Sequence, residues 1–344
     1  MQIAIIHNQP SGNDAFGEAE RGVVEVANWI ANVLGNAGHE TLLFAAGNPQ
    51  ELFAFLTRQR IDLVFNCCES FQGRARREMN VAAMFDLFGM PYTGSSALTL
   101  GITLDKGLAK AVLSDHGIAT PMSVRLEPGV DLSAADLPPF PLIVKPVAED
   151  ASIGIDDGAV VSDRRALDAR VHWVWTEFQQ AALVEEFIDG REFNVSLLAV
   201  AADEFVALPP AEITFEGLPR GIPRIVGYEA KWMPGSMRDR GTPVRCPAEL
   251  EPDVAAEVWT IALSAARAVG LRDYGRVDLR MRDRDRVLFV LEVNANPDLD
   301  PQAGFIRAAV AGGLNSREAI LEIVARAAER AGLADASAHV RSLA

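Results

Sequence analysis

A short stretch near the C-terminus, LEVNANP (residues 291–297), carries two side chains that could bind a metal ion. Glu292 and Asn294 alternate with apolar residues, which predicts a strand with one apolar face. The proline should end that strand, because it cannot donate to a β-ladder. An acid and an amide then leave the sheet on the same face, two residues apart. This spacing indicates a metal site; a polar strand edge facing water is the alternative.

The preceding strand, YGRVDLRMR (residues 274–282), offers a third oxygen ligand in Asp278 and places Arg276 on the same face. If the two strands form a hairpin, all four polar side chains crowd one face of it. Three oxygen ligands without His or Cys suit Mg²⁺ or Mn²⁺ better than zinc, and Mg²⁺ with few protein ligands normally shares substrate phosphates. The alternative is an exposed hairpin face with a local Arg276–Asp278 ion pair.

Lysines that could bind those phosphates lie upstream. Lys145 ends an apolar strand and precedes a loop of small residues and glycine, as in a phosphate clamp beneath a lid. A solvated lysine at a strand end is the alternative. Lys106 opens a helix, whereas Lys110 is expected on the solvated face of that helix.

Acidic residues surround a turn in ALVEEFIDGREF (residues 182–193). A strand that runs into a turn can present main-chain N–H and C=O groups to an adenine edge. A carboxylate in the same turn can accept hydrogen bonds from ribose hydroxyls. Acidic turns are common in proteins, so this pattern alone does not identify a nucleotide site.

Strands and helices alternate in the N-terminal part of the chain, which predicts a parallel sheet with helices on its faces. Ligands of such sheets lie at the carboxyl ends of the strands. A Pro/Gly turn at residues 90–95 is expected to end this domain. The expected strands are residues 2–6, 40–46 and 61–68, and the expected helices are residues 19–38, 49–60 and 78–89.

The rest of the chain predicts mixed α and β structure. Residues 216–247 are rich in Gly and Pro and lack a regular pattern, and a loop of this length is usually functional or disordered. Ser316 is the expected N-cap of the terminal helix. Helices are expected at residues 103–117, 165–178, 253–270 and 316–332, and strands at 140–146, 158–163, 182–188, 192–200, 204–213, 274–282 and 287–297.

The composition argues against several classes of function. The 344 residues suffice for two or three domains, and the net charge of −15 disfavours nucleic acid and anionic membranes as partners. Cys67, Cys68 and Cys246 lack the spacing of a disulfide framework and indicate a reducing compartment. We find neither a signal-peptide pattern nor an apolar run of membrane-spanning length, so a cytoplasmic protein is expected.

Six ordered motifs together resemble one family: LDKGLAKAVLSDHGIATP, LIVKPVAEDASIGI, LVEEFIDGREF, YEAKW, GRVDL and LEVNANP. In order and separation they resemble the D-alanine–D-alanine ligase branch of the ATP-grasp carboxylate–amine ligases. The resemblance implies an N-terminal parallel α/β domain (1–94) and two α+β subdomains (95–184 and 185–344) that sandwich ATP. It also implies an ADP-forming enzyme that joins a small carboxylate and an amine through an acyl phosphate. A homodimer is left open.

By resemblance, most of the quoted residues contact ATP. In the family, basic side chains contact the phosphates and a strand end reads the base. The roles carried over are Lys106 and Lys145 for the phosphates, Glu185 for the adenine amino group, the main chain of Glu186 and Ile188 for the adenine edge, and Glu192 for the ribose.

The remaining motifs correspond by resemblance to the chemistry of phosphoryl transfer. Two Mg²⁺ ions that bridge the phosphates, with Mn²⁺ as a substitute, are assigned to Asp278, Glu292 and Asn294. Lys231 resembles the lysine of a loop that closes over the γ-phosphate. Arg276 resembles the arginine that meets the transferring phosphoryl group.

The substrate side departs from the family pattern. The lid usually reads Glu-Gly-Ser-Ser, whereas here the last two residues are Ala151 and Ser152. The first of those serines normally bonds to an N-terminal glutamate and a tyrosine; Glu20 corresponds to the glutamate, and Trp232 replaces the tyrosine. The stretch that carries a substrate-side histidine in the family reads Asn66-Cys67-Cys68-Glu69 here.

The second substrate's site differs as well. Where the family has Pro-Gly-Met-Thr and then a serine that binds a carboxylate, this chain has Asp298 and Asp300, with Ala303 at the serine position. Two acids would repel a carboxylate and attract a cation. A basic or carboxylate-free amine, such as a diamine or an amidated amino acid, is therefore the expected acceptor. The alternative is that both acids cap a helix beginning at Pro301.

Four functions compete at this point. A ligase with substrates other than two D-alanines explains the intact ATP motifs and the altered substrate motifs. A true D-alanine–D-alanine ligase with drifted contacts is the nearest alternative. A non-catalytic ATP-binding protein would not need Arg276, and a dinucleotide oxidoreductase would need a G-x-G-x-x-G loop after the first strand, which HNQPSGN (residues 7–13) does not supply.

Overall fold

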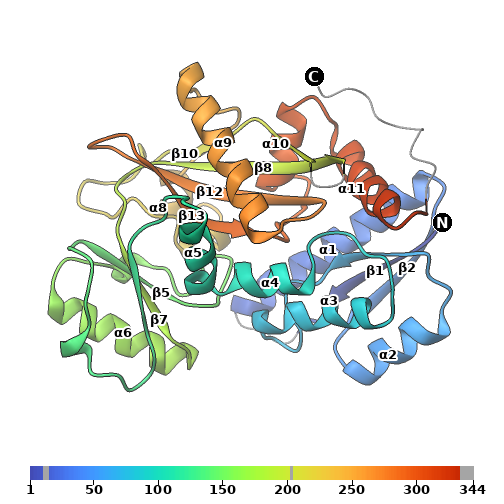
Figure 1. The fold of residues 1–344 in the computed structure, drawn as a ribbon, viewed down its shortest axis with the longest axis horizontal. Helices are drawn as coiled ribbons and strands as arrows, with labels where there is room; N and C mark the ends of the chain where they lie inside the picture. The colour runs from blue at the N-terminus through green and yellow to red at the C-terminus, as the bar shows by residue number, and fades with distance from the viewer. Residues whose placement is uncertain (11–14, 202–203, 334–344) are drawn as a thin grey trace.

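The computed structural model describes residues 1–10, 15–201 and 204–333, and for residues 15–20 it describes the backbone alone. Three sheets lie along the molecule (Figure 1). The N-terminal sheet and the sheet that carries α6 lie at opposite ends, and the largest sheet lies between them. The expected parallel unit followed by mixed α and β structure is confirmed.

The N-terminal sheet is parallel, with β1 in the centre and the order β2–β1–β3. Apolar side chains of β1 such as Ile3 and Ile5 are fully buried, which explains the uninterrupted apolar run in the sequence. The elements are β1 (Gln2–Asn8), α1 (Ala15–Asn36), β2 (Glu40–Ala46), α2 (Pro49–Arg58), β3 (Leu63–Cys67) and α3 (Glu78–Leu87).

The helix expected at residues 103–117 is wrong in its first turn. The chain forms α4 (Ala97–Leu104) and then α5 (Lys106–Asp115), with a break at Asp105. The Asp105 side chain accepts a hydrogen bond from the Leu108 N–H and so caps α5. This cap fixes Lys106 in the first turn of α5.

The sheet at the other end of the molecule is antiparallel, in the order β4–β7–β5–β6, and α6 packs against it. Its last strand in sequence, β7, runs to Glu186 and so extends past the expected boundary at residue 184; the three domain limits stay a prediction. The elements are β4 (Ser123–Leu126), β5 (Leu142–Pro146), β6 (Val160–Val161), α6 (Arg164–Phe178) and β7 (Ala182–Glu186).

The largest sheet has the order β11–β10–β8–β12–β13, with β9 paired to β8. α9 packs against β8, β12 and β13. Ser316 is not the N-cap of the last helix: Asn315 accepts hydrogen bonds from the Arg317 and Glu318 N–H groups, and Glu318 completes a capping box. The elements are β8 (Gly190–Ala201), β9 (Glu204–Ala207), β10 (Ala211–Ile213), β11 (Val244–Arg245), α9 (Pro252–Val269), β12 (Tyr274–Arg282), β13 (Leu288–Asn294), α10 (Gly304–Ala311) and α11 (Ser316–Arg330).

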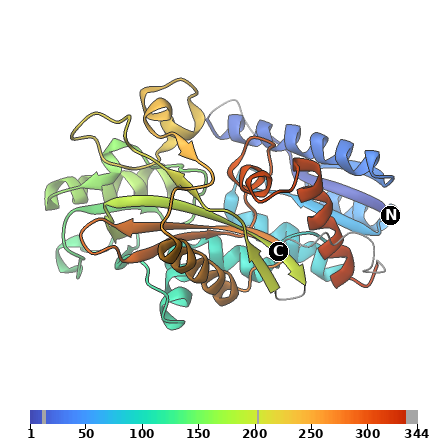
Figure 2. The same ribbon diagram turned by 90° about the horizontal axis from the view of Figure 1, so that it is seen from above.

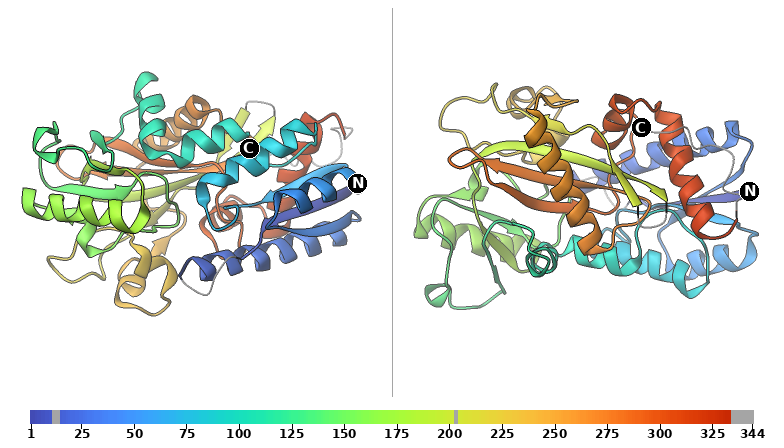
Figure 3. Two further views of the ribbon diagram at one scale, coloured as in Figure 1. Left: turned by 90° about the horizontal axis from the view of Figure 1, so that it is seen from below. Right: turned by 45° about the horizontal axis from the view of Figure 1, so that its top comes forward.

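The C-terminal helix α11 contacts α1 and β3, so the two ends of the described chain share one apolar core. Figures 2 and 3 show α11 beside the N-terminal sheet. The segment 216–247, expected to lack regular structure, contains α7 (Tyr228–Trp232), α8 (Met237–Gly241) and β11. Of the helices in the described residues, none has the length and hydropathy needed to cross a bilayer.

Candidate active site

The expected hairpin of β12 and β13 is present. The strands pair antiparallel, with Arg276 opposite Asn294 and Asp278 opposite Glu292. Arg276 donates from Nε and one terminal nitrogen to the two Asp278 oxygens, at 2.7 and 2.8 Å, and Asn294 Nδ2 donates to Asp278 Oδ2 at 3.0 Å. The four side chains therefore meet, as the sequence predicted.

Asn194 of β8 also contacts this group and was not predicted. Its Nδ2 donates to Asp278 Oδ1 at 2.7 Å, because β8 pairs with β12 and places Asn194 opposite Asp278. Among the described residues, no three His, Cys, Asp or Glu side chains converge on a possible metal position. Two carboxylates and an amide remain, which suits an ion that takes its other ligands from phosphates.

Glu292 lies among positive charges. Burial raises its pKa, but Lys106, Lys145 and Arg276 outweigh burial and lower that pKa to about 2. Lys106 Nζ lies 3.7 Å from Glu292 Oε2 and donates to the Glu149 carbonyl of the lid. Glu292 therefore stays ionised, as a cation ligand must.

Two lysines share one buried carboxylate beside this group. Lys145 Nζ lies 2.8 Å from Glu185 Oε2, and Lys110 Nζ lies 3.3 Å from Glu185 Oε1. The expected solvated position of Lys110 is wrong: it is 4% exposed, because α5 packs its inner face against the site. Burial lowers the pKa of Lys110 to about 8, with Lys145 adding to that decrease and Glu185 opposing it. The cluster carries one net positive charge when both lysines are protonated.

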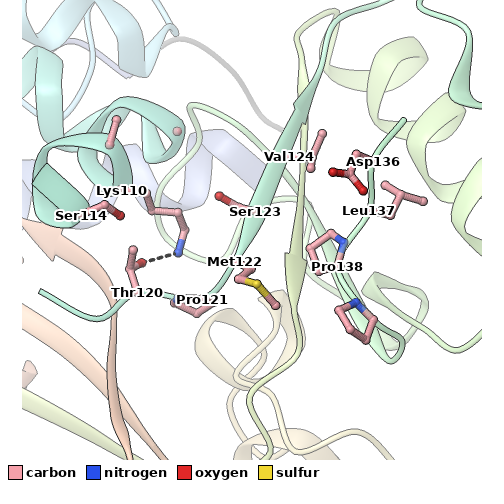
Figure 4. Close-up of a pocket in the computed structure, with 13 residues that line it drawn as sticks. Lys110, Ser114, Thr120, Pro121, Met122, Ser123, Val124, Asp136, Leu137 and Pro138 are labelled. Carbon is pink, nitrogen blue, oxygen red and sulfur yellow. Dashed lines mark hydrogen bonds between the residues drawn. The ribbon is translucent and has the colours of Figure 1, made fainter. Parts of the chain in front are cut away.

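Lys110 also lines a second cavity of about 640 Å³, on the outer side of α5 (Figure 4). There Lys110 Nζ donates to Thr120 Oγ1 at 2.8 Å, and that hydroxyl donates to the Val290 carbonyl of β13. These bonds fix Lys110 between Glu185 and the hairpin. The cavity also gives solvent a route toward the lysine.

The turn after β7 is fixed by an arginine that the sequence did not single out. Arg280, which is 3% exposed, contacts Glu192 at 2.8 Å and donates to the Ile188 carbonyl at 2.7 Å. Glu186 pairs with Arg282 at 2.9 Å. The residues predicted to read adenine and ribose are therefore adjacent, and Arg280 already compensates the charge of Glu192.

The lid residues contact the long loop. Trp232 Nε1 donates to the Ala151 carbonyl at 2.9 Å, and Ser152 Oγ donates to the Val226 carbonyl at 2.9 Å. Ala151 and Ser152 have φ angles of +57° and +60°, in the left-handed region where a Cβ is unfavourable. The lid therefore rests on the loop that carries Lys231, as expected for two parts that close together.

A cavity of about 810 Å³ lies between the lid, the hairpin and the N-terminal sheet. The structure thus brings many predicted residues to one space. Predicted residues in its lining are Glu69, Ala151, Lys231, Trp232, Arg276, Asn294, Asp298 and Asp300. Predicted residues outside that lining are Lys106 and Lys145 for the phosphates, Glu185, Glu186, Ile188 and Glu192 for adenine and ribose, Asp278 and Glu292 for the metal, and Ser152 of the lid. The side chain of Glu20 lies outside the described residues.

No helix begins at Pro301, but Asp300 makes the expected capping contact with the turn there, because its Oδ1 accepts a hydrogen bond from the Gln302 N–H at 2.7 Å. The Asp300 N–H donates to Asp298 Oδ1 at 2.8 Å. Helix α10 begins later, after Ala303, and has no side-chain cap. The Asp298 side chain reaches solvent through the cavity. The protein around it still removes part of its water, which raises its pKa; the Asp300 charge adds to that rise, and the hydrogen bond from the Asp300 N–H opposes it.

Comparisons with known proteins agree with this geometry. The family model described as the D-ala D-ala ligase C-terminus matches residues 132–325. A D-alanine–D-alanine ligase of Bordetella petrii is 32% identical over 87% of this chain and 85% of its own length. The chain belongs to the D-alanine–D-alanine ligase family. It is an ATP-dependent, ADP-forming ligase that makes C–N bonds.

Other relatives of this ligase are informative in different ways. An uncharacterised protein of Sinorhizobium fredii, y4sG, is 35% identical over 84% of this chain and 83% of its own length. The D-alanine–D-alanine ligase of Bacillus anthracis, solved with ATP, has a TM-score of 0.76 at 21% identity and covers 96% of this chain and 99% of its own. The VanG D-Ala:D-Ser ligase of Enterococcus faecalis has a TM-score of 0.72 at 19% identity, over 95% and 99% of the two chains. These structures show that the ligase has the ATP-grasp fold.

Several residues in the ligase cavity were not found by sequence reasoning. Glu78 is buried at the start of α3, and Asn296 Nδ2 donates to its carboxylate at 2.9 Å. Their contact joins segments 218 residues apart, so no local pattern could have revealed it. Asn8 ends β1, where ligands of parallel sheets bind. Arg74, Arg76 and Arg77 also line the cavity and could bind a carboxylate.

Proposed function

We propose that this ligase activates a carboxylate with ATP and Mg²⁺ and joins it to an amine, and that its substrate pair is not two D-alanines. The observation that carries the proposal is the hairpin group of Arg276, Asp278 and Asn294, which meets a large cavity also lined by Lys231. The substrate end of that cavity is acidic, with Glu69 and Asp298 in its lining.

The chemistry follows from the charges. A carboxylate oxygen attacks the γ-phosphorus and ADP leaves; the amine then attacks the acyl carbon, phosphate leaves, and the amine loses a proton. Mg²⁺ held by Asp278, Glu292 and Asn294 would neutralise phosphate charge. Arg276 keeps guanidinium donors beyond the two that bind Asp278, so it can stabilise the transferring group.

Water must be kept from the acyl phosphate, because it hydrolyses easily. The lid and the loop already touch through Trp232 and Ala151. Lys231 lies in the same helix as Trp232 and lines the cavity. We assign to Lys231 the closure of the loop over the γ-phosphate.

The assay measures ADP and product mass with ATP, Mg²⁺ and pools of amino acids and amines, and separately with D-alanine alone. We expect ADP release that depends on an acid and an amine together, and little dipeptide from D-alanine alone. Absence of substrate-dependent ADP release from every pool would contradict a ligase. The named relatives support the second candidate, a D-alanine–D-alanine ligase. A kcat/KM of about 10⁴ M⁻¹s⁻¹ or more for D-alanyl-D-alanine would establish it instead.

A further inference from the structure

The inner end of the large cavity lies where β1, β3 and α3 meet. Asn8 ends β1, Glu69 follows β3 and Glu78 begins α3, and all three line the cavity. The Glu78 side chain is buried, with the residue 6% exposed. In the described part of the chain, no lysine or arginine forms an ion pair with Glu69, Glu78 or Asp298.

Withdrawal from water raises the pKa of both inner carboxyls. The pKa of Glu69 rises to about 8, with Asp298 adding to the effect and Lys231 opposing it. The pKa of Glu78 rises well above its usual range, although the Asn296 hydrogen bond opposes that rise. Lys231 opposes the rise at Glu69 and at Asp298, and Arg276 opposes it at Asp298 alone. A further positive charge would therefore favour the ionised forms of Glu69 and Glu78.

Among the described residues, no arginine of the cavity lining forms an ion pair with Glu69 or Glu78, and Arg276 pairs with Asp278. Arg77 donates to Gln72. Burial raises the pKa of the lid residue Glu149, and the charge of Arg76 opposes that rise. Arg76 and Arg77 therefore leave the inner end acidic and place positive charge toward the lid.

A second observation, independent of the acids, indicates a bound group. Asn8 is 1% exposed, and its Oδ1 accepts a hydrogen bond from the Glu69 N–H at 3.2 Å. Its Nδ2 has no hydrogen-bond partner among the described residues. Native proteins rarely leave a buried amide donor unsatisfied, so an acceptor from a ligand is expected there. A ligand that combines ammonium groups with an oxygen acceptor satisfies the acids and Asn8 together.

We propose that Glu69, Glu78 and Asn8 bind the non-reacting end of a diamino acceptor, with an ammonium on the two acids and an oxygen on Asn8. The inference rests on the proposed ligase function, since it names the class of one substrate. The two amines have different roles: one attacks the acyl phosphate and loses a proton, and the other stays protonated in the acidic end. The amide of a diamino acid fits better than a plain diamine, because its carbonyl supplies the oxygen without adding a carboxylate to the acidic end.

The test compares matched acceptors with the 344-residue chain, ATP and Mg²⁺, and the acid is the one that supports the most ADP release in the pool assay described above. Ornithinamide, in both enantiomers, is compared with 5-aminopentanamide, and 1,4-diaminobutane with butylamine. Each pair keeps the amine that attacks, and the second member lacks the ammonium at the non-reacting end. We expect kcat/KM at least tenfold higher for the diamino member of a pair. Equal values for both members, with ADP release intact, overturn the inference and leave the ligase function standing. No ADP release with any acceptor rejects the ligase function itself.

Variants then locate the site. Glu78→Gln should reduce the ornithinamide-to-5-aminopentanamide ratio toward one, mainly through KM for ornithinamide, and Asn8→Ala should raise KM for ornithinamide more than for diaminobutane. The ratio does not depend on the fraction of folded enzyme, so a partly unfolded variant remains informative. If Glu78→Gln is inactive, Glu69→Gln is measured instead and should lower the same acceptor ratio. Glu257→Gln, on the exposed face of α9, is the matched control and should keep the ratio. A ratio unchanged in both Glu78→Gln and Glu69→Gln overturns the inference.

Discussion

The proposed nucleotide side and the proposed substrate side of the cleft differ in how their charges are compensated. On the nucleotide side Glu185 binds two lysines, and Glu192 binds Arg280. On the substrate side Glu69 and Glu78 form no ion pair with a lysine or arginine of the described chain. One side is complete before the ligand arrives, and the other is completed by it.

The difference follows from what each side has to recognise. ATP is the same anion in every turnover, so its contacts can be built into strands and capped helices that hold them in place. The substrate side selects among small molecules, and an uncompensated group there penalises every ligand that lacks the matching charge. Mutations on the proposed nucleotide side should therefore lower kcat. Mutations on the proposed substrate side should instead change which acceptor is used.

The largest effect is expected at the hairpin. Glu292→Gln removes a proposed metal ligand, and we expect kcat to fall by roughly 10³-fold or more. Asp285→Asn, in the turn of the same hairpin, is the control and should stay within about twofold. Steady-state ADP release against Mg²⁺ concentration measures both. Activity retained in Glu292→Gln with an unchanged Mg²⁺ dependence would rule out the metal assignment.

Glu292→Gln also tests the electrostatics of the nucleotide side. A carboxyl whose pKa is about 2 in the folded protein and about 4.5 when unfolded stabilises the fold above pH 4.5. That contribution is lost as the pH falls from 4.5 to 2. The ligand-free variant should therefore have a lower Tm than the wild type at pH 7 and a smaller difference near pH 3. A higher Tm at pH 7 would show that Glu292 is repelled by Asp278 more than Lys106 attracts it.

A smaller effect is expected where the two sides meet, at the closing loop. Lys231→Ala should lower kcat by about 10²-fold, while the Kd for ATP without other substrates changes little, because the loop acts after ATP binds. The segment 217–243 should also be cleaved by trypsin more slowly when an ATP analogue and an acid substrate are present. Arg220→Ala, in the same loop but not lining the cavity, is the control. Equal loss of ATP affinity and kcat in Lys231→Ala would contradict a closing role.

The sequence predicted the nucleotide side better than the substrate side, for a physical reason. Glu292 and Asn294 share a strand with a period of two, and their partner Asp278 lies on the next strand, so local pattern and a short hairpin fix the group. Glu78 and Asn296 meet only through the packing of the N-terminal domain on the hairpin. Lys110 was misjudged because a lysine in an amphipathic helix is normally solvated, and only the buried Glu185 makes its burial favourable.

That error leads to a prediction about Lys110. Lys110→Met removes the second lysine from Glu185 and leaves the cluster neutral, so we expect KM for ATP to rise about tenfold at pH 7, equivalent to about 1.4 kcal/mol. A lysine with a pKa of about 8 is charged below that pH and neutral above it. KM for ATP in the wild type should therefore increase between pH 7 and 9, whereas Lys110→Met should show no such increase. Lys110→Arg, which keeps its charge to higher pH, should keep a low KM at pH 9 if the side chain fits. A pH-dependent KM in Lys110→Met would assign the titration to another group.

The smallest effect is expected at Trp232, where the lid joins the loop. Trp232→Phe keeps the aromatic ring but removes the hydrogen bond to the Ala151 carbonyl, a loss of about 1 kcal/mol. Closure should become less favourable, so kcat should fall about fivefold while the acceptor ratio and KM for ATP stay nearly constant. In the double variant with Lys231→Ala the two effects should be less than additive in free energy, because both act on one closing step. A changed acceptor ratio in Trp232→Phe would instead show that Trp232 helps to select the acceptor. The lid would then belong to the substrate side of the cleft as well as to the closing loop.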